Sequence, residues 1–542
     1  MMLRRRANAH ARPRRGVPGA RRLPRRGLAV LAAASVAAAA AACSTTHRAQ
    51  TANARLTAVT CLPAAADSVI AGPADVVSAA VAGRLFASAP VVVLGDPDST
   101  ADLRTAAARA LALHAPLLLT SPPGAPVHTA SHGSGSASGA QARAGIFVSG
   151  AVRSEIEALG TRAVLAVGAA DKLLAAQIPG VQVVARPAGL PKTSTPVPVI
   201  GVVLLVHRGA DAPGALAAAT TARAAGASVV EVTGYDPGAD PAAIRALAAA
   251  RPRHVIAVGG RFGPASRLAY RVAVAVTGVQ LPGGGQVLFP MHRLVALYGY
   301  PGTPALGALG EQGLRASVAR VRHLADLYRP LSSVPVVPAF EIIATVAQDS
   351  PGPDGTYSYE SPISSLLPWV RTANADGLYV VLDLQPGRAS LLTQAKHYAR
   401  LLKLPDVGLA LDPEWKLQPG QVPLRQIGGV SIAEVNSVVT WLARLTARYH
   451  LPQKLLVLHQ FRLSMIVGEQ GLDTHHQDLA IIIHMDGQGT PADKLQTWEA
   501  VTRAAPRGVF FGWKNFFVKD HPMLSPSQTM ANRPHPLMIS YE

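Results

Sequence analysis

The first half of the chain repeats one hydrophobic pattern: a short continuous apolar run, a glycine-containing turn and an alanine-rich helical segment. Strands are predicted at Val91–Leu94 and Leu117–Leu119, and the pattern recurs in segments 145–168 and 226–260. Continuous apolar strands separated by helices are typical of parallel sheets with helices on both faces. We therefore expect a Rossmann-like α/β architecture in this half.

From His292 onward, strand-like apolar runs recur at wider spacing. Four helices are predicted between them, at 310–328, 388–403, 431–450 and 491–505, and the third begins with a Ser431/Glu434 capping box. The predicted strands are 293–300, 338–347, 377–384, 407–412, 454–461, 479–486, 508–513 and 535–542. Eight strands with seven crossovers in about 250 residues match a (β/α)8, or TIM-type, barrel.

These patterns predict five segments. A segment rich in proline and glycine, 279–293, marks the boundary before the barrel. The predicted segments are a signal peptide (1–42), a tether (43–66), a Rossmann-like wall-binding-type subdomain (67–195), a second Rossmann-like subdomain (196–286) and the barrel (287–542).

The N-terminus has the pattern of an export signal. Arginine pairs precede an apolar run of 16 residues ending at Cys43, too short and too rich in alanine for a good membrane span. The sequence "AAAC" resembles the lipobox of bacterial lipoproteins, and the resemblance implies acylation of Cys43 and a membrane-anchored or cell-wall-associated protein outside the cytoplasm. The alternative is ordinary cleavage after an A-x-A site, and both the general and the twin-arginine export routes fit.

The net charge of +19 does not indicate nucleic-acid binding. Ten arginines lie within the first 26 residues, before any acidic residue, and removing them leaves +9. The rest of the chain has no compact basic cluster with interleaved aromatic residues. Only Cys43 and Cys61 are present, so lipidation of the first would exclude a disulfide within the chain.

The turn "VGGRFGPAS" (258–266) lacks the G-x-G-x-x-G spacing of dinucleotide sites, and we expect no cofactor. The segments "AAARALALHAPLLLTS", "RAVLAVGAADKLL" and "RHVIAVGG" resemble the cell-wall-binding repeat 2 domains of exported bacterial proteins. The resemblance covers about residues 68–278 and implies attachment to a cell-wall polymer. A plain doubly wound domain of unknown ligand is the alternative.

Polar and aromatic residues follow the apolar runs of the predicted barrel. Because the carboxyl ends of barrel strands form the active face, these side chains are expected to meet in one bowl. The candidate catalytic residues are Asp383, Asp412, Glu414 and Asp486. The candidate substrate-binding residues are Tyr298, Trp415, His459, Gln460, His484, Trp513 and Lys514.

Opposed carboxylates with aromatic platforms suit a polysaccharide substrate. The layout resembles barrel glycoside hydrolases with catalytic aspartates after strands four and six, which implies Asp412 as nucleophile or base and Asp486 as acid. Glu414 would matter more if the strand register were shifted by one residue. Asp412 and Asp383 could instead cap turns, and Trp415 and Trp513 could instead be packing residues.

A metal is not expected, because His459, His484 and Asp486 lack H-E-x-x-H or comparable spacing, and His475 and His476 fit an exposed loop. The sequence thus predicts an exported envelope protein that binds cell-wall polymer and hydrolyses a polysaccharide. The alternative is a non-catalytic surface or solute-binding lipoprotein with a degenerate barrel.

Overall fold

The computed structural model describes residues 55–121, 147–168, 174–209 and 212–542. The predicted signal peptide and Cys43 lie outside these residues. None of the helices in the described ranges is both long enough and apolar enough to cross a membrane. The chain is mixed α/β, with parallel sheets before residue 260 and a closed parallel barrel after residue 292.

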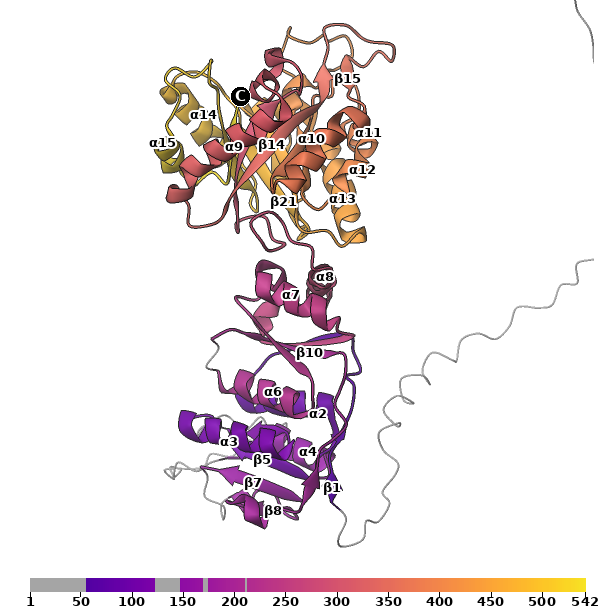
Figure 1. Ribbon diagram of the computed structural model, residues 1–542, viewed down its shortest axis with the longest axis vertical. Helices are drawn as coiled ribbons and strands as arrows, with labels where there is room; N and C mark the ends of the chain where they lie inside the picture. Colours follow the sequence, from indigo (N-terminus) through magenta and orange to yellow (C-terminus); the bar gives the residue numbers. More distant parts are fainter. Residues whose placement is uncertain (1–54, 122–146, 169–173, 210–211) are drawn as a thin grey trace, which may run out of the picture. The chain divides into compact units, whose positions relative to one another are not determined.

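The first half contains two four-stranded parallel sheets (Figure 1). One has the strand order β6-β5-β7-β8 and the other β11-β10-β12-β3. Their strands are β3 (Asp67–Ile70), β5 (Val91–Gly95), β6 (Leu117–Leu119), β7 (Ala163–Val167), β8 (Gln182–Val184), β10 (Val202–His207), β11 (Ser228–Val232) and β12 (His254–Val258). Short pairings join β1 (Leu56–Thr57) to β9 (Thr193–Ser194) and β2 (Val59–Thr60) to β4 (Phe86–Ser88).

Helices cover both faces of each sheet, as the continuous apolar strands predict. The helices are α2 (Ala74–Leu85), α3 (Thr100–Leu113), α4 (Gly150–Ala158), α6 (Pro213–Ala224), α7 (Pro241–Ala250) and α8 (Ala265–Val276). Val92 of β5 and Leu204 of β10 belong to one apolar core that includes α2, α4 and α6. Strand β3 pairs with β12, so the start of the predicted 67–195 segment completes the sheet of the next one. The proposed domain boundaries remain predictions.

Eight parallel strands close into a barrel, and β13 pairs with both β14 and β23. The TIM-type fold predicted from the sequence is confirmed. The barrel strands are β13 (Arg293–Gly299), β14 (Val336–Ala347), β16 (Tyr379–Leu384), β17 (Val407–Leu411), β19 (Lys454–His459), β21 (Leu479–Met485), β22 (Phe510–Asn515) and β23 (Met538–Tyr541). Strand β15 (Ser358–Glu360) adds antiparallel to β14, and β18 (Val430–Ser431) pairs with β20 (Ile466–Val467).

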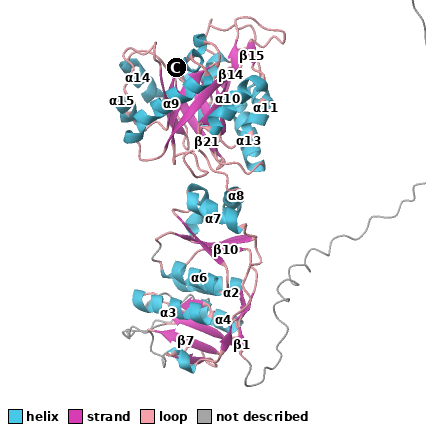
Figure 2. Cartoon of the chain, in the orientation of Figure 1, coloured by secondary structure: helices cyan, strands magenta, loops and turns pink. Residues whose placement is uncertain are grey.

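The barrel helices lie outside the strands (Figure 2). They are α9 (Leu314–Tyr328), α10 (Ile363–Ala375), α11 (Leu391–His397), α12 (Ala399–Leu402), α13 (Ile432–Arg448), α14 (Pro491–Ala504) and α15 (Pro526–Ala531). The predicted helix 388–403 is split into α11 and α12. Helix α10 was not predicted, and it carries an internal proline, Pro368, a residue that normally interrupts a helix. The Ser431 side chain accepts a hydrogen bond from the backbone of Glu434, but the Glu434 carboxylate binds Lys416 Nζ instead of completing the capping box.

Alternation along each barrel strand determines which side chains enter the barrel. In β13, Val295 and Leu297 pack against the helices, whereas Leu294 and Ala296 belong to the interior core. The interior core also contains Val381 of β16 and Val457 of β19. Because side chains alternate between the two faces, every second residue from these positions also faces inward.

Candidate functional site

The inward positions at the carboxyl ends of the strands are strongly polar. One more alternate step from the apolar interior core reaches a charged or hydrogen-bonding side chain on nearly every strand. These residues are Tyr298, Glu341, Asp383, Asp412, His459, His484, Lys514 and Ser540. Asp486 and Glu542 continue the same alternation just beyond β21 and β23. The barrel therefore gathers the charged candidates of the sequence at one end.

His459 lies at the centre of this group. Its Nε2 is 3.0 Å from Oε1 of Glu341 and 3.9 Å from Oδ1 of Asp383, and its Nδ1 is 3.1 Å from Oδ2 of Asp486. Burial opposes a charge on the imidazole, but the carboxylates of Glu341 and Asp486 outweigh it and raise the pKa of His459 well above its usual value. His459 is thus held as a cation facing Asp486.

Asp383 and Lys514 both contact Tyr298 in the bowl. The Tyr298 hydroxyl donates to Oδ2 of Asp383 at 2.9 Å, and burial raises the pKa of Asp383 to about 6. Lys514 Nζ lies 3.4 Å from the centroid of the Tyr298 ring and 2.7 Å from Oε2 of Glu542. Burial would lower the pKa of Lys514, but Glu542 and Asp486 reverse this and raise it, so the ammonium keeps its charge.

Asp412 and Glu414 follow β17 on one short turn, and both hold protons more tightly than usual. Asp412 is 3% exposed, and burial together with Glu414 and Asp383 raises its pKa well above the ordinary value. Glu414 is partly buried, and burial together with Asp486 raises its pKa to about 7. The turn therefore carries two carboxyl groups with raised pKa values, of which Glu414 is partly protonated near pH 7.

An open cavity of about 510 Å³ lies over this bowl. Glu414 and Asp486 line it with Lys514 and Glu542, whereas Asp412 and Asp383 are not among its lining residues. Apolar and aromatic side chains complete the wall, among them Tyr298, Trp415, Phe461 and Phe516. Its volume falls within the roughly 300–1,000 Å³ of small-ligand sites. Of the carboxyl groups predicted as catalytic, Glu414 and Asp486 are the two that line the cavity.

Four predicted substrate-binding residues do not line the cavity: His459, which lies beneath it, and Gln460, His484 and Trp513. Trp513 faces outward on β22 and is fully buried with Met485 and Trp498, so it fits the packing alternative instead of a sugar platform. Gln460 is also buried, and its amide donates to Oε2 of Glu469. His484 faces inward, where it hydrogen-bonds Ser540 Oγ at 3.0 Å.

His484 forms part of the packed floor below the bowl. Burial, with His459 and Lys514, lowers the pKa of His484 well below its usual value, so its ring is neutral. A Cβ at Gly512 would lie 2.9 Å from Cδ2 of His484, which explains the glycine at this inward position of β22. In the loop before β21, His475 and His476 contact Asp473, and the His475 side chain is 94% exposed.

Sequence reasoning missed Glu542, Gln385 and Arg462, which also line the cavity. Glu542 could have been found by counting alternate residues along the last strand from Met538 in the interior core. Gln385 donates to the Tyr298 hydroxyl from the end of β16. Arg462 lies in a loop after β19, and no periodic signal marks it.

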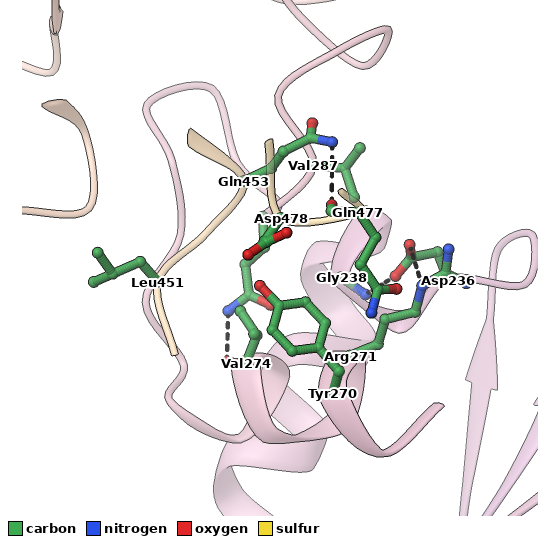
Figure 3. Close-up of a pocket in the computed structure, with 11 residues that line it drawn as sticks. Asp236, Gly238, Tyr270, Arg271, Val274, Val287, Leu451, Gln453, Gln477 and Asp478 are labelled. Carbon is green, nitrogen blue, oxygen red and sulfur yellow. Dashed lines mark hydrogen bonds and ion pairs between the residues drawn. The ribbon is translucent and has the colours of Figure 1, made fainter. Parts of the chain in front are cut away.

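Within the described ranges, no group of three or more His, Cys, Asp and Glu side chains is arranged to hold a metal ion. A second cavity, of about 40 Å³, is lined by Tyr270 and Asp478 and lies near the ion pair of Arg271 with Asp236 (Figure 3). Burial and Asp478 raise the pKa of Tyr270. A water molecule takes about 30 Å³ of the liquid, so this cavity is too small for a sugar.

Comparison with known proteins adds no family to this description. No family model matches the chain, and no curated protein matches it. The site is therefore interpreted from its own geometry.

Proposed function

We propose that the barrel hydrolyses a glycosidic bond of an envelope polysaccharide. The observation that carries this proposal is the presence in one cavity of two carboxyl groups in different surroundings. Glu414 holds a proton up to a pH of about 7, and Asp486 faces the cationic His459. A protonated acid beside a charge-stabilised carboxylate is the pair that glycoside hydrolysis requires.

In this mechanism Glu414 donates its proton to the glycosidic oxygen as the bond to the leaving sugar breaks. The carboxylate of Asp486 either attacks the anomeric carbon or removes a proton from the attacking water. The Nδ1 atom of His459 faces Asp486 at 3.1 Å, and Glu341 contacts the Nε2 atom on the other side of the same ring. The roles differ from the sequence expectation, in which Asp412 was the nucleophile or base and Asp486 the acid.

Asp412 has a supporting role in the proposal. Its carboxyl is buried below the cavity wall and its raised pKa favours the neutral form. Trp415 lines the same cavity and offers an aromatic surface for the C–H face of a sugar ring.

The test is incubation of the purified protein with bacterial cell-wall polysaccharide, followed by measurement of new reducing ends. Wild-type protein should release them, and Asp486→Asn should not. The anomer formed first, observed by NMR, then distinguishes retention from inversion. Binding of wall glycan by wild-type protein without any release of reducing ends would overturn the proposal in favour of a non-catalytic binding protein.

A further inference from the structure

A further cleft, distinct from the small cavity near Tyr270, adjoins the cavity over the bowl. It has a volume of about 400 Å³ and shares Glu414, Trp415 and Arg462 with the cavity wall. We call it the arginine cleft, because Arg425 and Arg462 line it. Arg425 lies in the loop after β17 and Arg462 in the loop after β19, and these two strands are paired neighbours.

The two arginines differ from the lysines of the catalytic cavity. Lys514 and Lys519 both contact the carboxylate of Glu542, so each lysine has an acidic partner. Neither Arg425 nor Arg462 has a side-chain hydrogen bond or ion pair with any residue that the structure describes. Both are exposed, and the Arg462 guanidinium lies 5.8 Å from the Phe461 ring centroid.

The arginine cleft therefore carries an excess of positive charge. Among the described residues that line it, Glu414 is the one acidic residue, and its pKa of about 7 leaves part of this group neutral at neutral pH. Guanidinium groups bind carboxylates and phosphates through two parallel hydrogen bonds. Trp415 and Leu424 supply apolar surface in the same cleft, so a sugar ring can pack while its charged substituent meets an arginine.

We propose that the arginine cleft binds an anionic substituent, a carboxylate or a phosphodiester, on the glycan unit next to the bond that is cleaved. This inference rests on the proposed function and names the substrate class as an acidic polysaccharide. A neutral glycan would leave two guanidinium groups beside the reacting sugar without a counter-charge.

The experiment measures binding to full-length Asp486→Asn protein, in which hydrolysis is lost and the residues that line the arginine cleft are unchanged. The probes are oligogalacturonate, its fully methyl-esterified form of equal length, and poly(glycerol phosphate). We expect oligogalacturonate or poly(glycerol phosphate) to bind about tenfold more tightly than the neutral ester, with the preferred probe identifying the anion. Arg425→Gln and Arg462→Gln should each remove most of that difference.

Arg444→Gln is the matched control, because Arg444 is an exposed arginine on α13 that does not line the cleft. Equal binding of charged and neutral probes, or unchanged binding in both cleft variants, would overturn the inference. The two proposals fail in different ways. Hydrolysis without charge preference rejects the acidic substrate alone, whereas arginine-dependent binding without any hydrolysis by wild-type protein rejects the enzyme alone.

Discussion

The Nε2 atom of His459 lies 3.0 Å from Oε1 of Glu341, and both side chains are fully buried. The two residues come from β19 and β14 and meet inside the barrel, 118 positions apart in the sequence. Glu341 is the largest cause that raises the pKa of His459 against the effect of burial. Glu341 thus stabilises the cationic imidazole of His459 next to Asp486, at a buried position where water cannot solvate the charge.

Removal of the Glu341 charge should destabilise the protonated form of His459 and the folded protein. We expect Glu341→Gln to lower the pKa of His459 and to reduce the free energy of unfolding by about 3–5 kcal/mol, because a buried charge loses its partner. NMR titration of the imidazole and urea unfolding measure the two effects. Glu360→Gln is the control, since Glu360 contacts His397 in a partly exposed pair and should cost less than about 1 kcal/mol. A stable variant with an unchanged His459 titration would contradict the interpretation.

The separate roles proposed for Glu414 and Asp486 can be tested by changing the leaving group. Glu414→Gln should slow hydrolysis of the natural polysaccharide by about 10²–10⁴-fold, because general acid catalysis is lost. The same variant should retain cleavage of a dinitrophenyl glycoside, whose leaving group needs no proton. Asp486→Asn should lose both activities. Glu499→Gln, on the exposed surface of α14, is the control. Equal losses on both substrates for Glu414→Gln would show that it is not the acid.

The pH dependence follows from Glu414. Its pKa is raised from the ordinary 4.5 to about 7 by burial and Asp486, and in the proposed mechanism its protonated form donates the proton. kcat/KM should therefore fall as the pH rises through about 7. By linkage, Glu414 favours folding most below about pH 4.5, and this stability is lost between about pH 4.5 and 7. Glu414→Gln should flatten that part of the stability curve, and a falling limb near pH 4.5 would disagree with the assignment.

Two tryptophans should respond differently to truncation. Trp415 lines the cavity, so Trp415→Ala should weaken glycan binding with little change in melting temperature. Trp513 is fully buried, so Trp513→Ala should destabilise the barrel by about 3–5 kcal/mol. Calorimetric melting and glycan affinity are measured on both proteins, each serving as the control for the other. Unchanged glycan affinity in Trp415→Ala would remove this residue from the proposed site.

The anchor prediction concerns Cys43. Cys43→Ala protein should leave the membrane fraction and appear in a soluble fraction outside the cell, because the acylated residue is absent. Immunoblots of membrane and culture fractions measure this. Cys61→Ala is the control, and it should fractionate as wild-type protein does. Unchanged fractionation of Cys43→Ala would reject the lipoprotein interpretation.

The sequence by itself determined the barrel. Uninterrupted apolar runs specified its eight strands because a parallel strand is buried on both faces. Strict alternation also determined, in principle, that Asp383 and His459 share the inner face with the apolar interior core. Trp513 was predicted to lie in the bowl because it follows an apolar run. The alternation places it on the outer face of its strand instead, where it packs with Met485 and Trp498.

Tertiary structure decided which inward groups meet and how they titrate. The partnership of His459 with Glu341 depends on barrel closure, because strands far apart in the sequence face each other across its interior. The proton on Glu414 depends on burial and on Asp486 from another strand. The pairing of Arg425 and Arg462 in one cleft depends on two loop conformations. None of these has a sequence signal, because loops carry no hydrophobic period and a pKa depends on neighbours that only folding brings together.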